Sequence, residues 1–258
     1  MEGRVVRISI APVKSLHLVH PEEIELTRAG VVGDRRFWLL DADGRLANGK
    51  RFPQLMQILP EWDEATRRLT FELPGGERIN GIVEAGEPVE PTLYGTPHPS
   101  RRVGGPWEEA ISELAGEPLT LLWSERGAVD RGSDRGGWAS IISRASIEGL
   151  GTMAGAAAPD ARQFRMLFEI DGVAENEEDE WIGRHVEVGD AVVKPLGDIG
   201  RCVTTTRNPD TGEHAFPTLD TLAAYRREGV TEPLPLGVYC DVVEPGRVRV
   251  GDPVSCVS

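Results

Sequence analysis

The sequence predicts a mainly β protein with a few helices, of the barrel or sandwich type. Short segments alternate apolar and polar residues with a period of two, as in residues 4–10 and 68–73. Turn signals rich in Gly, Pro and Asp follow these segments at short spacing, and such a series is typical of all-β architectures. The 258 residues suit one large domain or two that pack tightly, because no segment has the composition of a loose linker.

The expected strands follow the chain in order. They cover residues 4–10, 23–26, 37–40, 68–73, 119–123, 141–142, 165–170, 185–193, 238–243 and 247–250. The strand at 37–40 ends in the turn sequence Asp41-Ala42-Asp43-Gly44. The last two strands are expected to form a hairpin around Pro245-Gly246.

Three helices are expected, over residues 107–114, 144–150 and 219–227. Gly116 follows the first helix at the position where a left-handed residue commonly ends one. Ser143 is a good N-cap for the second, and Gly149 and Gly151 are placed at its exit. Residues 127–137 form a polar, Gly-rich loop.

The charge balance restricts the classes of function. The formal net charge of −14 argues against a protein that binds nucleic acid through Lys and Arg. The acidic run 175–180 is expected to be a solvated loop. No apolar stretch is long enough to span a bilayer, and the start of the chain lacks a signal-peptide pattern. We therefore expect a cytoplasmic protein that does not bind membranes.

One cysteine stands out from the other two. Cys202 lies beside Arg201 and before three threonines, and a neighbouring cation favours the reactive thiolate. From these residues alone, a functional cysteine and a buried structural one remain open alternatives. Cys240 and Cys256 lie in apolar surroundings and are expected to be inert. The spacing of the three predicts neither a disulfide framework nor a zinc site.

Several separated segments together resemble one known pattern. They are residues 12–15, 33–38, 51–55, 142–147, 164–165, 178–183, the segment around Cys202, and residues 225–226, 236–239 and 250–254. In this order they resemble the MOSC domain family, and within it the proteins with an N-terminal MOSC β-barrel domain, such as the mitochondrial amidoxime-reducing component and its bacterial relatives. The resemblance implies an N-terminal domain over residues 1–122 and a MOSC β-barrel domain over residues 123–258.

The resemblance also implies a mononuclear molybdenum cofactor, molybdenum on a molybdopterin, in the cleft between the two domains. Cys202 matches the family's metal ligand and is the expected catalytic residue, which agrees with the preference of molybdenum for soft thiolates. The other matching positions are expected to bind the cofactor. They are Lys14 and Ser15 at its phosphate end, Arg35, Gly137 through its backbone amide, Arg165, Arg201 and Tyr239.

The function implied by the resemblance is the reduction of N-hydroxylated small molecules. Electrons must come from a separate donor protein, because the chain lacks dinucleotide, iron–sulfur and haem motifs. The alternatives are a sulfur carrier with a persulfide on Cys202 and a non-catalytic binding module for an anion. Met166-Leu167 stands where relatives usually have Pro-Asn, so the cofactor surroundings or the substrate range are expected to differ.

Overall fold

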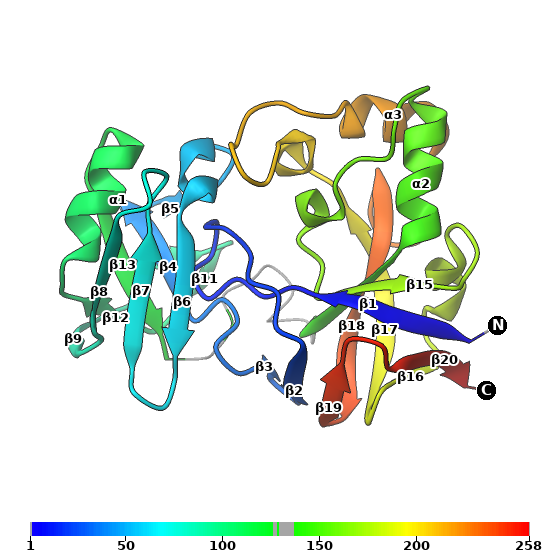
Figure 1. The fold of residues 1–258 in the computed structure, drawn as a ribbon, viewed down its shortest axis with the longest axis horizontal. Helices are drawn as coiled ribbons and strands as arrows, with labels where there is room; N and C mark the ends of the chain where they lie inside the picture. The colour runs from blue at the N-terminus through cyan, green and yellow to red at the C-terminus, as the bar shows by residue number, and fades with distance from the viewer. Residues whose placement is uncertain (1, 126–127, 129–136, 258) are drawn as a thin grey trace.

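The computed structural model describes residues 2–125, 128 and 137–257 (Figure 1). Its main element is a closed barrel of seven strands in the order β1-β15-β14-β18-β17-β16-β20. These strands are β1 (Gly3–Ile8), β14 (Ala139–Ser143), β15 (Phe168–Asp171), β16 (His185–Val188), β17 (Ala191–Gly200), β18 (Pro235–Glu244) and β20 (Pro253–Val257). Alternate side chains of these strands point inward and form one buried core. The predicted mainly β fold is therefore confirmed.

Residues 9–125, called the first half below, contain a second body with its own core. A five-stranded sheet has the order β5-β4-β13-β12-β9, and a three-stranded sheet has the order β6-β7-β8. Their bounds are β4 (Phe37–Asp41), β5 (Leu46–Ala47), β6 (Leu59–Asp63), β7 (Arg68–Glu72), β8 (Arg78–Ile82), β9 (Ala85–Val89), β12 (Ser100–Val103) and β13 (Leu119–Ser124). Helix α1 (Trp107–Ala115) contributes the fully buried Trp107 to this core and ends at Gly116 with φ 78°, as predicted.

The two halves share strands. β1 begins the chain but belongs to the barrel, where it pairs with β15 and with β20 (Figure 1). A three-stranded sheet joins β2 (Glu23–Thr27) and β3 (Gly30–Val31) to β19 (Gly246–Arg249). The remaining elements are the pair β10 (Thr92–Leu93) and β11 (Thr96–Pro97) and helix α3 (Thr218–Tyr225). These pairings hold the two halves against each other.

β14 and β15 are parallel neighbours, and this determines the path of the chain between them. A parallel pair needs a crossover, which helix α2 (Arg144–Met153) provides. Ser143 caps α2 as predicted, its Oγ accepting a hydrogen bond from the Ser146 amide at 3.1 Å. The return path includes a short 3-10 helix, η3 (Ala161–Phe164). Arg165 ends η3 in the left-handed conformation, so the predicted strand over 165–170 is wrong in its first residues.

Two more strand predictions are wrong for reasons of turn chemistry. Residues 185–193 form two strands rather than one, because Gly189 has φ 57° and turns the chain between β16 and β17. β18 and β19 do not pair with each other as a hairpin. Only Pro245 separates them, which leaves no room for a two-residue hairpin turn, and β19 pairs with β2 instead.

The predicted ends of two helices also change. α2 continues to Met153, so Gly149 and Gly151 lie inside it. A Cβ on Gly149 would come within 2.3 Å of the Glu175 side chain, and one on Gly151 within 2.7 Å of the Ala158 backbone. These glycines therefore permit close packing rather than ending the helix. α3 ends at Tyr225, two residues earlier than predicted.

The acidic run is only partly a solvated loop. Residues Glu177–Trp181 form a 3-10 helix, η4, in which Glu178 is fully buried. Its Oε1 accepts hydrogen bonds from the Ser143 amide at 3.1 Å and from Ser146 Oγ at 2.8 Å. Burial raises the pKa of Glu178. Glu178 therefore stabilises the start of α2 instead of facing solvent.

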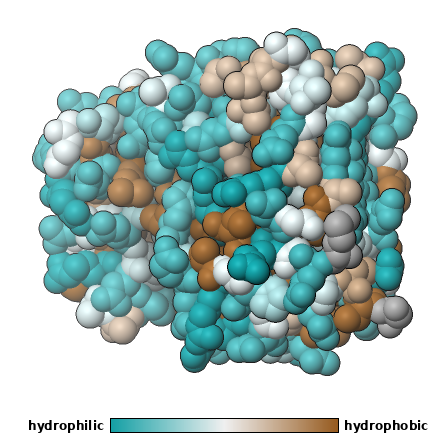
Figure 2. Space-filling view, turned by 45° about the vertical axis from the view of Figure 1, so that its right-hand side comes forward, coloured by the Kyte–Doolittle hydropathy of each residue, from teal (hydrophilic) through white to brown (hydrophobic). Residues whose placement is uncertain are grey.

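The visible face of the molecule is mainly hydrophilic, with apolar side chains in small groups between charged ones (Figure 2). This surface agrees with the formal charge of −14. Within the described part of the chain, no helix is long and apolar enough to cross a membrane.

Candidate functional site

A cavity of about 680 Å³ lies between the first half and the barrel. All eight residues expected to bind the metal or the cofactor line it: Lys14, Ser15, Arg35, Gly137, Arg165, Arg201, Cys202 and Tyr239. They come from six separate segments of the chain. The structure thus brings the predicted set to one place.

Lys14 and Ser15 follow the barrel strand β1 in the chain, and backbone contacts hold them against β4. Val13 forms a bridge with Phe37, and the Lys14 amide donates to the Phe37 carbonyl at 2.8 Å. Ser15 then has φ 78°, a left-handed conformation that is uncommon for residues other than glycine. The Lys14 Nζ lies 5.8 Å from the centre of the Tyr94 ring. The two predicted phosphate-binding residues therefore sit on a firmly held turn.

Arg35 and Arg165 connect the two sides of the cavity. Both are left-handed, with φ 46° and 54°. Arg35 Nη1 pairs with the buried Asp34, and its Nη2 donates to the Arg165 carbonyl at 3.3 Å. Arg165 Nη2 donates to the Leu16 carbonyl at 2.8 Å. Backbone strain of this kind clusters at functional sites, and here it occurs at neighbouring cavity residues.

Arg201 lies in the wall of the cavity. Its Nη1 donates to the Phe164 carbonyl at 3.2 Å, and its Nη2 contacts Met166 Sδ at 3.1 Å and the Leu236 carbonyl. Burial lowers the pKa of Arg201 to about 9, so the guanidinium remains charged at neutral pH. Its Nε is buried without a hydrogen-bond partner in the residues that the structure describes. The wall thus holds a cation with one donor atom unused.

Cys202 stands at the end of β17, where the chain leaves the barrel. It is the N-cap residue of a short 3-10 helix, η5 (Val203–Thr206). Its carbonyl accepts hydrogen bonds from the Thr205 amide at 2.9 Å and from Thr205 Oγ1 at 2.8 Å. These contacts fix the backbone, while the partly exposed thiol lines the cavity.

Asp198 organises the loop that faces Cys202. It is 1% exposed and accepts hydrogen bonds from the Val230 amide, the Thr231 amide at 3.1 Å, Thr231 Oγ1 at 2.7 Å and the Glu232 amide at 2.8 Å. Burial acts to raise the pKa of Asp198, but these hydrogen bonds outweigh it and the pKa is lowered. The loop in turn places Glu232 in the cavity, where its Oε2 accepts from the Gly200 amide at 3.2 Å.

Asp198→Asn is expected to destabilise the fold by about 2–3 kcal/mol at pH 7, because its amide would face backbone donors. A lowered pKa contributes stability above the unfolded value, near pH 4, and loses it as the pH falls further. Urea unfolding should therefore show a difference from wild type that shrinks below about pH 4. The exposed Asp220→Asn is the control, with a change below about 1 kcal/mol. An equal loss of unfolding free energy in both variants would contradict the structural role given to Asp198.

The sequence interpretation missed several polar residues of the cavity: Asn48, Lys50, Gln163, Asp198 and Glu232. Gln163 is 3% exposed, and its Oε1 has no hydrogen-bond partner within the described ranges. These residues lie on separate segments of the chain, so no local motif marks them. Asp198 offered one signal, because a carboxylate that is buried within a strand must be hydrogen-bonded.

The three cysteines differ in access, which allows a direct test. Burial raises the pKa of both Cys240, which is fully buried, and Cys256. Neither lines the cavity. A thiol reagent added to cofactor-free protein is expected to modify Cys202 first, as peptide mass spectrometry would show. Cys256→Ser should leave the rate of modification at Cys202 unchanged. Faster modification at Cys256 or Cys240 than at Cys202 would contradict this expectation.

Comparisons with known proteins cover both halves of the chain. Residues 2–95 match the MOSC N-terminal beta barrel domain, and residues 137–255 match the MOSC domain. Mitochondrial amidoxime-reducing component 1 of Mus musculus is 28% identical over 281 residues, which cover 98% of this chain and 82% of that protein. Mitochondrial amidoxime reducing component 2 of Bos taurus is 27% identical over 287 residues, with coverage of 98% and 82%. The Homo sapiens component 2 is 28% identical over 287 residues, with coverage of 98% and 83%.

Proposed function

Because the chain belongs to the MOSC domain family and carries the family's N-terminal domain ahead of its MOSC domain, we propose that it is a molybdenum-cofactor-dependent reductase of N-hydroxylated compounds. The relatives named above are amidoxime-reducing components. The observation that carries the proposal is a cavity that gathers one cysteine thiol and several cationic side chains.

The residues of this cavity fit a molybdopterin. Its lining carries five cationic residues and two carboxylates, and one of the carboxylates, Asp198, is already saturated with hydrogen bonds. An excess of positive charge suits a phosphate. The unused atoms, Arg201 Nε and Gln163 Oε1, offer a buried donor and a buried acceptor, and a pterin ring has groups complementary to both. The Cys202 thiol is a soft ligand for molybdenum.

In this proposal each residue binds the part of the cofactor that lies nearest to it. Lys14, Ser15 and Arg35 hold the phosphate end, and Arg165, Arg201 and the Gly137 amide hold the pterin. Tyr239 lines the wall of β18 nearby. Cys202 binds the metal. When bound, the cofactor supplies two-electron chemistry: the substrate N–O bond breaks, two protons and two electrons are taken up, and water leaves. The electrons come from a separate donor protein.

The runner-up is a sulfur carrier that holds a persulfide on Cys202. The position of the other two cysteines disfavours a thiol relay within this chain, because neither Cys240 nor Cys256 lines the cavity. Two further expectations belong to the proposal and remain predictions: a cytoplasmic location, and an altered cofactor environment at Met166 and Leu167. Both residues are buried and line the cavity.

The deciding experiment is metal and pterin analysis after expression in a host that makes the cofactor. We expect about one molybdenum and one pterin per chain, together with reduction of benzamidoxime by a chemical reductant. Molybdenum without turnover would favour cofactor handling, and sulfane sulfur on Cys202 without molybdenum would favour the sulfur carrier. Absence of both would leave the anion-binding module.

A further inference from the structure

Asp210 lies on the turn that follows Cys202, outside the cavity lining. The Asn208 side chain shapes this turn by accepting from the Asp210 amide at 2.8 Å and the Thr211 amide at 3.1 Å. The turn docks on the first half of the chain, where Gln57 Nε2 donates to the Thr211 carbonyl at 3.2 Å. Asp210 is thus presented at the junction between the turn and the other segments of the site.

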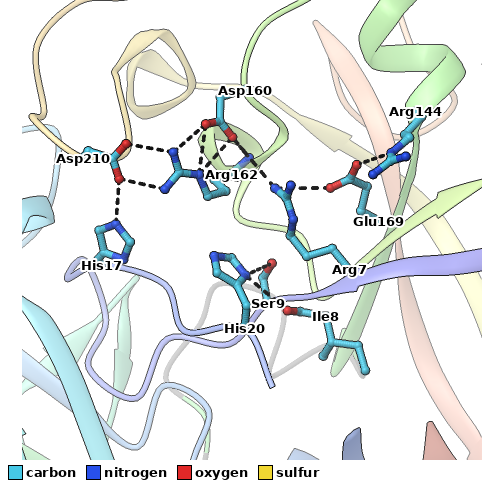
Figure 3. A network of polar contacts seen from close by, with 10 residues as sticks. All are labelled: Arg7, Ile8, Ser9, His17, His20, Arg144, Asp160, Arg162, Glu169 and Asp210. Atoms are coloured by element: carbon cyan, nitrogen blue, oxygen red, sulfur yellow. Dashed lines mark hydrogen bonds and ion pairs between the residues drawn. The ribbon is translucent and has the colours of Figure 1, made fainter. Parts of the chain in front are cut away.

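An arginine and a histidine hold the Asp210 carboxylate (Figure 3). Arg162 donates through Nη1 to Oδ1 at 2.7 Å and through Nη2 to Oδ2 at 2.8 Å. His17 Nε2 lies 3.0 Å from the same Oδ1. Arg162 is itself oriented by Asp160, which its Nη2 contacts at 2.7 Å. A forked pair of this kind fixes direction as well as distance.

The partners of Asp210 belong to segments that each carry a cofactor-binding residue. His17 follows Lys14 and Ser15 on one turn, and Arg162 precedes Arg165 on η3. We propose, resting on the proposed function, that Asp210 is a positioning residue that holds the Cys202 segment in register with the Lys14 and Arg165 segments. It contacts neither metal nor substrate and acts through Arg162 and His17.

His17 contacts two acceptors through its two ring nitrogens. Its Nδ1 lies 2.7 Å from the Leu18 carbonyl, while Nε2 lies 3.0 Å from the Asp210 carboxylate. A contact to the backbone on one side of the ring fixes the direction in which the other nitrogen points. His17 therefore links Asp210 to the backbone of the turn that carries Lys14 and Ser15.

The other charged groups near His17 are accounted for. The Arg162 fork lowers the pKa of Asp210 to about 2, so this carboxylate is charged at neutral pH. Arg7, with Glu169 and Asp160, belongs to the same network but lies on the far side of Arg162 (Figure 3). His20 faces Ser9 and the Ile8 carbonyl, and burial lowers its pKa. His20 is therefore a matched control.

The test measures the rate of molybdenum loss from holoprotein during dialysis at pH 6. Asp210→Asn is expected to lose molybdenum about five- to ten-fold faster than wild type, since partly exposed charge pairs are modest in strength. His17→Gln should also lose it faster than wild type, because its contact with Asp210 is removed. His20→Gln should keep the wild-type rate. The KM for substrate should stay unchanged in Asp210→Asn.

A second measurement separates this proposal from the proposed function. Hydrogen exchange of residues 203–212 in cofactor-free protein should be faster in Asp210→Asn than in wild type, while exchange in β4 and β13 stays the same. If wild type itself binds no molybdenum, the proposed function fails and the exchange data still test the positioning. Equal metal loss and equal exchange in Asp210→Asn and wild type would overturn the proposal.

Discussion

Cys202→Ser is expected to abolish reduction of N-hydroxylated substrate, with activity lowered by more than about a hundred-fold. Serine replaces a soft thiolate by a harder hydroxyl that keeps its proton at neutral pH, so the metal loses its protein ligand. The fold should be unaffected, because Cys202 Sγ is partly exposed and makes no hydrogen bond within the portion described by the structure. Activity with benzamidoxime and molybdenum content together measure the effect.

The matched control is Cys256→Ser, which changes the same atom in β20, away from the cavity. It should keep its metal and its activity. If Cys202→Ser reduced substrate as well as wild type, the assignment of the metal ligand would be wrong. If it kept its molybdenum but lost turnover, Cys202 would act in the chemistry without being needed for retention.

Lys14→Met is expected to lower cofactor occupancy by about ten- to a hundred-fold when cofactor is limiting. The methionine keeps most of the length of the side chain but removes the charge that the phosphate end requires. The free energy of unfolding of the cofactor-free protein should change by less than about 1 kcal/mol, because the turn is held by backbone contacts. Pterin fluorescence after denaturation, against a chemical melt of the apoprotein, measures both quantities.

Arg35→Ala is a less suitable test of the same site. It would leave the buried Asp34 without its ion-pair partner, and breaking a buried pair costs about 3–5 kcal/mol. Lower occupancy in that variant would therefore combine a ligand effect with a folding effect. Occupancy in Lys14→Met equal to that of wild type would remove Lys14 from the phosphate site.

The local features of the fold were predictable where a local cause produces them. Period-two alternation predicts β1 and β7, and capping chemistry predicts Ser143 and Gly116. Long-range pairing determines the rest. Apolar residues suggested a strand at Arg165, but the parallel pairing of β14 and β15 makes that segment part of a crossover. No local pattern indicates that β19 pairs with β2 rather than with β18.

The candidate site shows the same division. The eight expected residues were predicted together from family resemblance. No local feature of residues 12–15 or 236–239 indicates that these segments line the same cavity. Asp198 and Gln163 were missed because their roles depend on partners far along the chain. No local signal in the sequence marks His17, and only the fold brings Asp210 to its Nε2. A site that is formed by residues far apart in the sequence cannot be recognised from the spacing of residues within a short motif.

The pairing of β1 with β20 has a consequence for how the protein acquires its shape. Gly3 lies opposite Val254, so the barrel closes only after its last strand has left the ribosome. Until β20 is made, one edge of β1 has no partner strand. The unpaired backbone groups of that edge could pair with a strand of another chain. Such a high contact order predicts slow closure of the barrel after synthesis, while the sheets of the first half can fold early.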